Sequence, residues 1–193
     1  YLHDAAGGAD RVCLKVSSLP TETEYVNVIP TLETERLTLL PPTLLHFDMY
    51  QAFYTDGHAS AMYGGPISNE QVWARLKADV GSWALLGFGV WVIQVKDTQQ
   101  FVGTCGFWQG KAWPRELTWW ITPDARGKGI AVEASRAAIH YAYNSFGWEN
   151  VQPYMNDDNI AARNLVLKLG GEKIDRQQFD DGQSRDIYRL PNG

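Results

Sequence analysis

ITPDARGKGIA, residues 121 to 131, is the stretch of this sequence that decides the fold. It follows a run typical of a β-strand, residues 116 to 120, and it leads into a helical pattern of apolar residues from 131 to 146. A glycine-rich turn therefore opens a helix at the point where a strand ends.

The helix start lacks the residues that usually cap a helix. The first N–H groups of a helix have no internal partner, and Ser, Thr, Asp or Asn normally binds them, yet this helix begins Gly127-Lys-Gly129. Glycine allows a positive φ and a close approach of the backbone to a phosphate. The helix dipole, Arg126 and Lys128 all favour negative charge. We therefore expect a phosphorylated cofactor here.

The sequence of this turn does not match two familiar phosphate-binding motifs. A Walker loop needs a hydroxyl residue directly after its lysine, and Lys128 is followed by Gly129. A dinucleotide fingerprint starting at Gly127 needs glycine where the chain has Val132. A P-loop is excluded, and Rossmann-type binding is disfavoured.

The segment resembles the pyrophosphate motif of the GNAT superfamily of N-acetyltransferases, Arg/Gln-x-x-Gly-x-Gly/Ala, which it matches at Arg126, Gly129 and Ala131. Residues 33–41, ETERLTLLP, resemble the opening strand of the Rim-type branch, the ribosomal-protein N-acetyltransferase relatives. Residues 159–170 resemble the Asn-x-x-Ser/Ala helix of that branch. The three matches occur in the family's order and span roughly residues 29 to 191.

The resemblance implies a mixed α+β GNAT fold, with a central, mostly antiparallel twisted sheet of about seven strands flanked by about four helices. Local patterns agree, because residues 44–53 and 70–85 read as helices and residues 88–95, 101–108 and 116–121 read as strands. We expect one domain over residues 29–193. Residues 1–28 read as a leader or loosely packed extension, although Val12, Leu14 and Val16 also allow an edge strand.

The composition limits the classes of molecule that the protein is expected to bind. A chain of 193 residues that is 45% hydrophobic can bury the core of one domain, and a net charge of −5 without a basic run argues against nucleic acid. No apolar stretch of about 18 residues could cross a membrane, so a cytoplasmic protein is expected. Scattered histidines and the isolated Cys13 and Cys105 predict no metal site. Exposed edge strands make a homodimer one option.

The resemblance implies acetyl-CoA as co-substrate and direct attack of a neutral amine on its thioester. Strand alternation puts Glu116 on one face with Thr118 and Trp120, and a glutamate at the matching position is the general base in many GNAT relatives. Glu116 is therefore the candidate base. The alternative is a salt bridge with Arg115 or Lys111 at the mouth of the strand.

Three segments are expected around the cofactor. Asn159 either contacts the pantetheine arm or caps the following helix, and the two uses are compatible. Arg163 and Lys168, on the helix that follows Asn159, either reach the CoA phosphates or form a solvated, positively charged surface, and both interpretations stay open. The expected cofactor residues are Trp120, Ile121, Thr122, Arg126, Gly127, Lys128, Gly129, Ile130, Ala131, Asn159, Arg163 and Lys168.

The acceptor is expected to be a small-molecule amine or a peptide N-terminus, bound near Tyr63 and Gly64 by resemblance. One departure is clear. Val166 stands where many GNATs carry a tyrosine that protonates the leaving thiolate, and Ala162 replaces the Rim-type serine. Another tyrosine or a water molecule must therefore protonate the thiolate, or the thiolate leaves without a proton donor. Two other readings follow, a module that binds acyl-CoA without turnover and a nucleotide-binding protein in which ATP or NAD competes with CoA.

Overall fold

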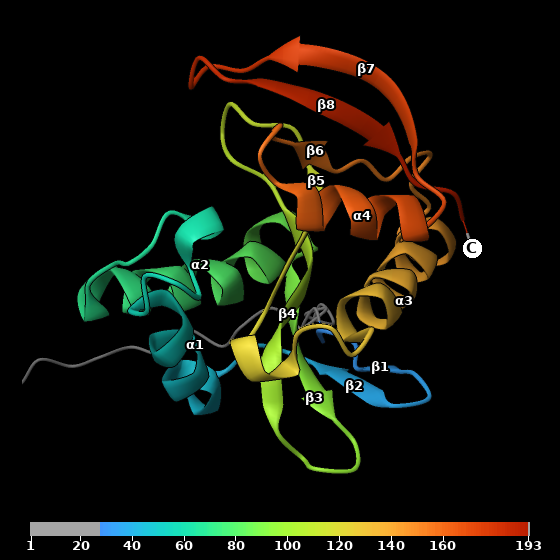
Figure 1. The fold of residues 1–193 in the computed structure, drawn as a ribbon. Helices are drawn as coiled ribbons and strands as arrows, with labels where there is room; N and C mark the ends of the chain where they lie inside the picture. Colours follow the sequence, from blue (N-terminus) through green and yellow to red (C-terminus); the bar gives the residue numbers. More distant parts are fainter. Residues whose placement is uncertain (1–27, 193) are drawn as a thin grey trace, which may run out of the picture.

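The computed structural model describes residues 28–192 (Figure 1). The expected extension over residues 1–28 and its possible edge strand therefore lie almost wholly outside the described residues. Within residues 28–192, no helix combines the length and the apolar character needed to cross a membrane.

A five-stranded antiparallel sheet forms the centre of the molecule. Its strands run in chain order: β1 (Leu32–Glu33), β2 (Leu37–Leu40), β3 (Val90–Val95), β4 (Phe101–Trp108) and β5 (Glu116–Ile121). Helices α1 (Phe47–Tyr54) and α2 (Asn69–Leu86) lie on one side of this sheet, and α3 (Ile130–Asn144) lies on the other (Figure 1). Three short 3-10 helices complete this part: η1 (Leu44–His46), η2 (Ala61–Tyr63) and η3 (Pro123–Ala125).

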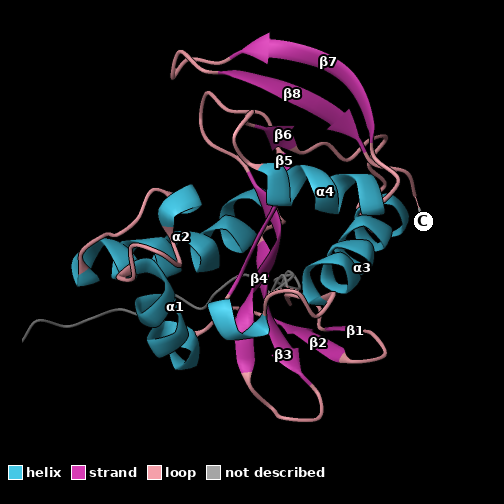
Figure 2. Cartoon of the chain, viewed as in Figure 1, coloured by secondary structure: helices cyan, strands magenta, loops and turns pink. Residues whose placement is uncertain are grey.

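The remaining strands form a second sheet. It contains β6 (Tyr154–Met155), β7 (Glu172–Gln178) and β8 (Ser184–Arg189) in the order β6-β8-β7, and α4 (Ile160–Lys168) packs beneath it (Figure 2). The expected α+β fold is confirmed, with its strands divided between two sheets. The Leu117 N–H on β5 donates to the carbonyl of Gln152, shortly before β6, at 3.1 Å, which links the two sheets.

The main core lies between the five-stranded sheet and α3. Alanines at three inward positions of α3, Ala134, Ala138 and Ala142, are completely buried. Small side chains let the helix approach the sheet closely, so the position of its first turn is fixed by packing. The helix patterns at 70–85 and 131–146 are confirmed within two residues at each end.

A second, aromatic cluster packs α1 and α2 against β5. The rings of Phe53 and Trp120 stack with centroids 4.1 Å apart, and Tyr50 meets Trp120 edge to face at 5.3 Å. The buried Tyr50 hydroxyl donates a hydrogen bond to Asp79 at 2.8 Å. The helix expected over residues 44–53 begins as the 3-10 turn η1 before continuing as α1.

Candidate functional site

The first turn of α3 presents unpaired backbone N–H groups. Gly129 is its N-cap residue with φ 77°, Gly127 has φ 76°, and no side chain caps the helix. Within residues 28–192, the N–H groups from 127 to 132 donate no hydrogen bond. Because these amides also lie at the positive end of the helix dipole, they are suited to bind an anion.

Arg126 holds the loop in front of this helix. Its Nε donates to the Ile121 carbonyl at 3.0 Å, and its Nη2 donates to the Ala59 carbonyl at 2.7 Å. The side chain thereby ties the end of β5 to the segment between α1 and η2. Arg126 adds positive charge to the site and also shapes it.

Arg36 and Glu133 anchor the other side of the turn, and sequence reasoning missed both. Arg36 Nε lies 2.6 Å from Glu133 Oε2, and Arg36 Nη1 donates to the Lys128 carbonyl at 3.0 Å. The Thr34 hydroxyl donates to the same carboxylate at 2.6 Å. Since these partners are nearly 100 residues apart in the chain, no local pattern could have revealed the contact.

A groove of about 290 Å³ runs from the α3 turn toward α4. Asn159 caps α4, because its side-chain oxygen accepts from the Ala162 N–H at 3.1 Å, and the residue also lines the groove. The expected cofactor residues that line the groove are Ile121, Arg126, Gly127, Gly129, Ile130, Ala131, Asn159 and Lys168.

The other four expected cofactor residues lie elsewhere. The Trp120 side chain is buried among α1 and α2, so only its backbone is available to a cofactor. Thr122 and Lys128 line a different cavity. Arg163 turns toward Asp157, whose carbonyl accepts from its Nη2 at 3.4 Å, and it does not line the groove.

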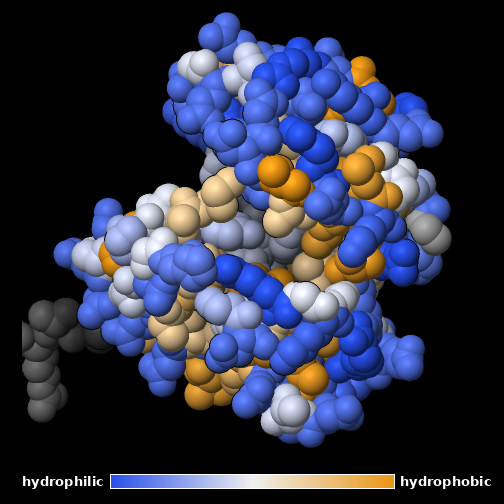
Figure 3. Space-filling model, viewed as in Figure 1, coloured by the Kyte–Doolittle hydropathy of each residue, from blue (hydrophilic) through white to orange (hydrophobic). Residues whose placement is uncertain are grey.

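A smaller pocket of about 220 Å³ contains Glu116 and adjoins the groove. Tyr63, Trp119, Asn159 and Ala162 line both spaces. Gly64, the other expected acceptor residue, has φ 76° and ends η2 directly after Tyr63. Figure 3 shows this face of the molecule hollowed between its upper and lower parts.

Sequence reasoning assigned no role to three residues of the Glu116 pocket: Tyr154, Asn156 and Arg185. Tyr154 lies on β6, Asn156 directly follows β6, and Arg185 lies on β8. The second sheet places all three residues beside β5. The Arg185 guanidinium lies 4.7 Å from the Trp113 ring centroid and pairs with Asp181. Only the three-dimensional arrangement of the two sheets unites these residues.

Glu116 has the electrostatics of a base. Burial raises the pKa of its carboxyl to about 7, while the charge of Arg185 favours the charged form. Within residues 28–192 Glu116 forms no ion pair, and the neighbouring Arg115 guanidinium instead stacks 3.4 Å from the Trp148 ring centroid. A carboxyl with a pKa near neutrality can accept a proton from an amine and release it to solvent.

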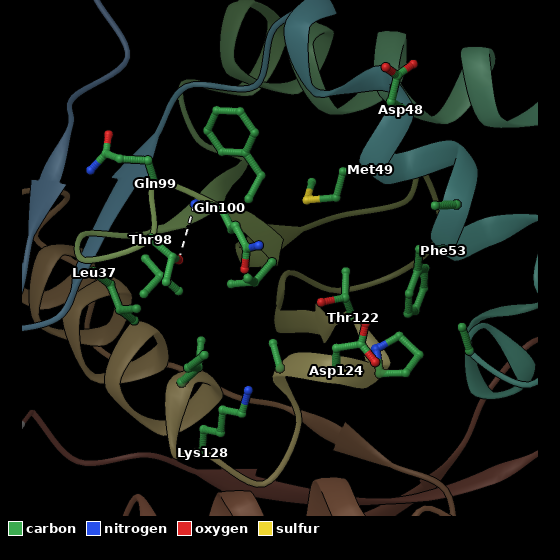
Figure 4. Close-up of a pocket in the computed structure, with 18 of the residues that line it drawn as sticks. Leu37, Asp48, Met49, Phe53, Thr98, Gln99, Gln100, Thr122, Asp124 and Lys128 are labelled. Carbon is green, nitrogen blue, oxygen red and sulfur yellow. Dashed lines mark hydrogen bonds between the residues drawn. The ribbon is translucent and has the colours of Figure 1, made fainter.

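A larger cavity than these two spaces lies on the other side of the α3 turn. It has a volume of about 890 Å³, and α1, the β3–β4 turn and η3 line it. Figure 4 shows Lys128 and Asp124 at one end and Thr98 and Gln100 at the hairpin side. Neither Glu116 nor Asn159 lines this cavity. Within residues 28–192, no group of three or more His, Cys, Asp or Glu residues is placed to hold a metal.

The acetyltransferase (GNAT) domain family matches residues 36–172, which includes the α3 turn, Glu116 and α4. This chain belongs to the GNAT acetyltransferase family. The predicted membership of the GNAT superfamily is thereby confirmed.

Similar proteins agree with this membership. The chain is 26% identical over 152 residues to the uncharacterized N-acetyltransferase YoaA of Bacillus subtilis, covering 76% of this chain and 85% of YoaA. An acetyltransferase of Agrobacterium tumefaciens is 27% identical, with a TM-score of 0.77 and coverage of 85% and 95%. The ribosomal-protein-S5-alanine acetyltransferase of Vibrio fischeri shares the fold at 14% identity, with a TM-score of 0.68 and coverage of 85% and 97%. Rim-type enzymes are thus among the structural neighbours of this GNAT acetyltransferase.

Proposed function

We propose that this acetyltransferase moves the acetyl group of acetyl-CoA directly to a primary amine, with Glu116 as general base. The observation that carries the proposal is the junction of two spaces. The groove beside the unpaired amides of α3 and the pocket that holds Glu116 share Tyr63, Trp119 and Asn159. A thioester at this junction would stand between the cofactor groove and the base.

On the cofactor side, the pyrophosphate of CoA would accept hydrogen bonds from the N–H groups of residues 127–132. The pantetheine arm would then follow the groove toward Asn159. Because the side-chain oxygen of Asn159 already caps α4, its NH₂ group is the part left to donate to the arm. Lys168, at the far end of the groove, would lie beside the remaining phosphate charge.

On the acceptor side, Glu116 would remove a proton from the attacking amine, directly or through one water. A pKa of about 7 leaves a substantial fraction of the carboxyl charged at neutral pH. The pocket volume of about 220 Å³ admits the amine and a few neighbouring atoms, so the rest of the acceptor would lie outside. Both a small amine and a protein N-terminus satisfy this limit.

The alternative of a module that binds acyl-CoA without turnover is less well supported. It was suggested by Val166 and Ala162, which supply no acidic side chain. The cofactor groove nevertheless opens onto a carboxyl whose burial and pKa suit proton transfer. A module that only binds acyl-CoA needs no proton acceptor at the end of its cofactor groove.

A thiol-release assay with acetyl-CoA and a panel of amino acids, polyamines and short peptides tests the proposal. Glu116→Gln should lower release by about 100-fold or more, in the range of a lost general base, while the calorimetric Kd for CoA stays within about twofold. Glu149→Gln, at an exposed glutamate outside both spaces, is the matched control and should behave like the wild type. Full activity in Glu116→Gln would refute its role, and tight CoA binding without release would favour the binding module.

A further inference from the structure

Tyr63 lies where the two spaces meet. Its ring packs edge to face on Phe53, with centroids 5.4 Å apart, and it lines both the Glu116 pocket and the cofactor groove. The η2 turn and the Arg126 contact to Ala59 hold its segment against the α3 loop. None of the side-chain hydrogen bonds formed within residues 28–192 involves its hydroxyl.

We propose that the Tyr63 hydroxyl donates a hydrogen bond to the sulfur of CoA as the thioester breaks. This inference rests on the proposed function. It assigns the task left open by Val166 to a residue about 100 positions earlier in the chain. Tyr63 is thereby a catalytic residue and is more than part of the acceptor wall.

The chemistry balances without a proton leaving Tyr63. The amine nitrogen forms a bond to the acetyl carbon, Glu116 takes the amine proton, and the C–S electron pair passes to sulfur. Burial raises the pKa of Tyr63 to about 12, opposed by the charge of Arg126, whereas a thiol has an ordinary pKa near 8.5. Tyr63 therefore keeps its proton and stabilises the thiolate by hydrogen bonding. The thiolate takes a proton from solvent after release.

Tyr154 is the other tyrosine beside Glu116, and it fits the task less well. Its hydroxyl donates to Gln152 at 3.3 Å, so it already has a partner. It lines the Glu116 pocket and does not line the cofactor groove. Tyr154→Phe is accordingly a matched control for Tyr63→Phe.

The test compares binding of CoA with binding of desulfo-CoA, which lacks the thiol, by calorimetry at pH 6.5 and pH 9.5. In the wild type and in Tyr154→Phe, the preference for CoA should grow about 10-fold or more at pH 9.5, because a hydrogen bond to a charged group forms only with the thiolate. Tyr63→Phe should lose this gain and lower kcat by about 10- to 100-fold with little change in KM.

The outcomes separate the two proposals. Absence of CoA binding by the wild type would overturn the proposed function itself. If CoA binds and thiol is released, but Tyr63→Phe keeps the pH-dependent preference for CoA, the role of Tyr63 is refuted and the proposed function stands. Because phenylalanine preserves the ring that packs on Phe53, a folding defect is not expected, and an unchanged melting temperature checks this.

Discussion

At the scale of single residues, the proposed role of Glu116 as general base predicts how the rate depends on pH. The wild-type rate of thiol release should rise with pH and level off above about 7, because only the charged carboxyl accepts a proton. Below that value the rate should fall about tenfold per pH unit. The residual rate of Glu116→Gln should not show this fall at low pH. A wild-type profile that is flat from pH 5 to 8 would contradict the assignment.

The same pKa affects stability. The folded state holds the Glu116 proton more tightly than the unfolded chain, where the ordinary value is 4.5. The free energy of unfolding should therefore fall as pH rises from about 4.5 to 7, and Glu116→Gln should remove that part of the decline. Urea denaturation of both proteins at pH 5 and pH 8 measures the difference. Equal pH dependence in the two proteins would show that the carboxyl is not perturbed.

At the scale of elements, the α3 start depends on left-handed glycine. Gly129→Ala should weaken CoA binding about tenfold, since an L-residue at φ 77° costs about 1–2 kcal/mol and the added Cβ would lie 3.4 Å from Arg36 Nη2. Gly147→Ala is the control, because Gly147 has φ 67° with nothing within 4 Å of a Cβ and lies outside the groove. It should lose similar stability and bind CoA normally. Equal CoA affinity in the two variants would argue against the anion site.

The α1–α2 pair carries a second pH-dependent contact. Burial raises the pKa of Asp79 to about 6, opposed by the Tyr50 hydrogen bond and by Arg75. Since the folded pKa exceeds the ordinary 3.8, stability from this group falls as pH rises through about 4 to 6. Tyr50→Phe removes the hydroxyl partner and should cost about 1–3 kcal/mol at pH 8 but less at pH 5, as measured by denaturant unfolding. A cost independent of pH would contradict this view.

At the scale of the whole molecule, the sequence predicted more of the fold than of the candidate site. Strand and helix periods are local, and the glycines of residues 126–131 predict the turn that opens α3. The division into two sheets is not local, and it places Arg185 and Tyr154 beside Glu116. Charge alone also misplaces Arg163, which turns toward Asp157, and Lys128, which lines the larger cavity. A homodimer and a cytoplasmic location stay predictions.

A crystal structure of the protein with bound CoA would locate both the pyrophosphate and the sulfur. We expect the pyrophosphate on the N–H groups of residues 127–132, and the sulfur between Tyr63 and Glu116. CoA bound instead in the larger cavity that Lys128 lines, with the Glu116 pocket empty, would contradict this expectation.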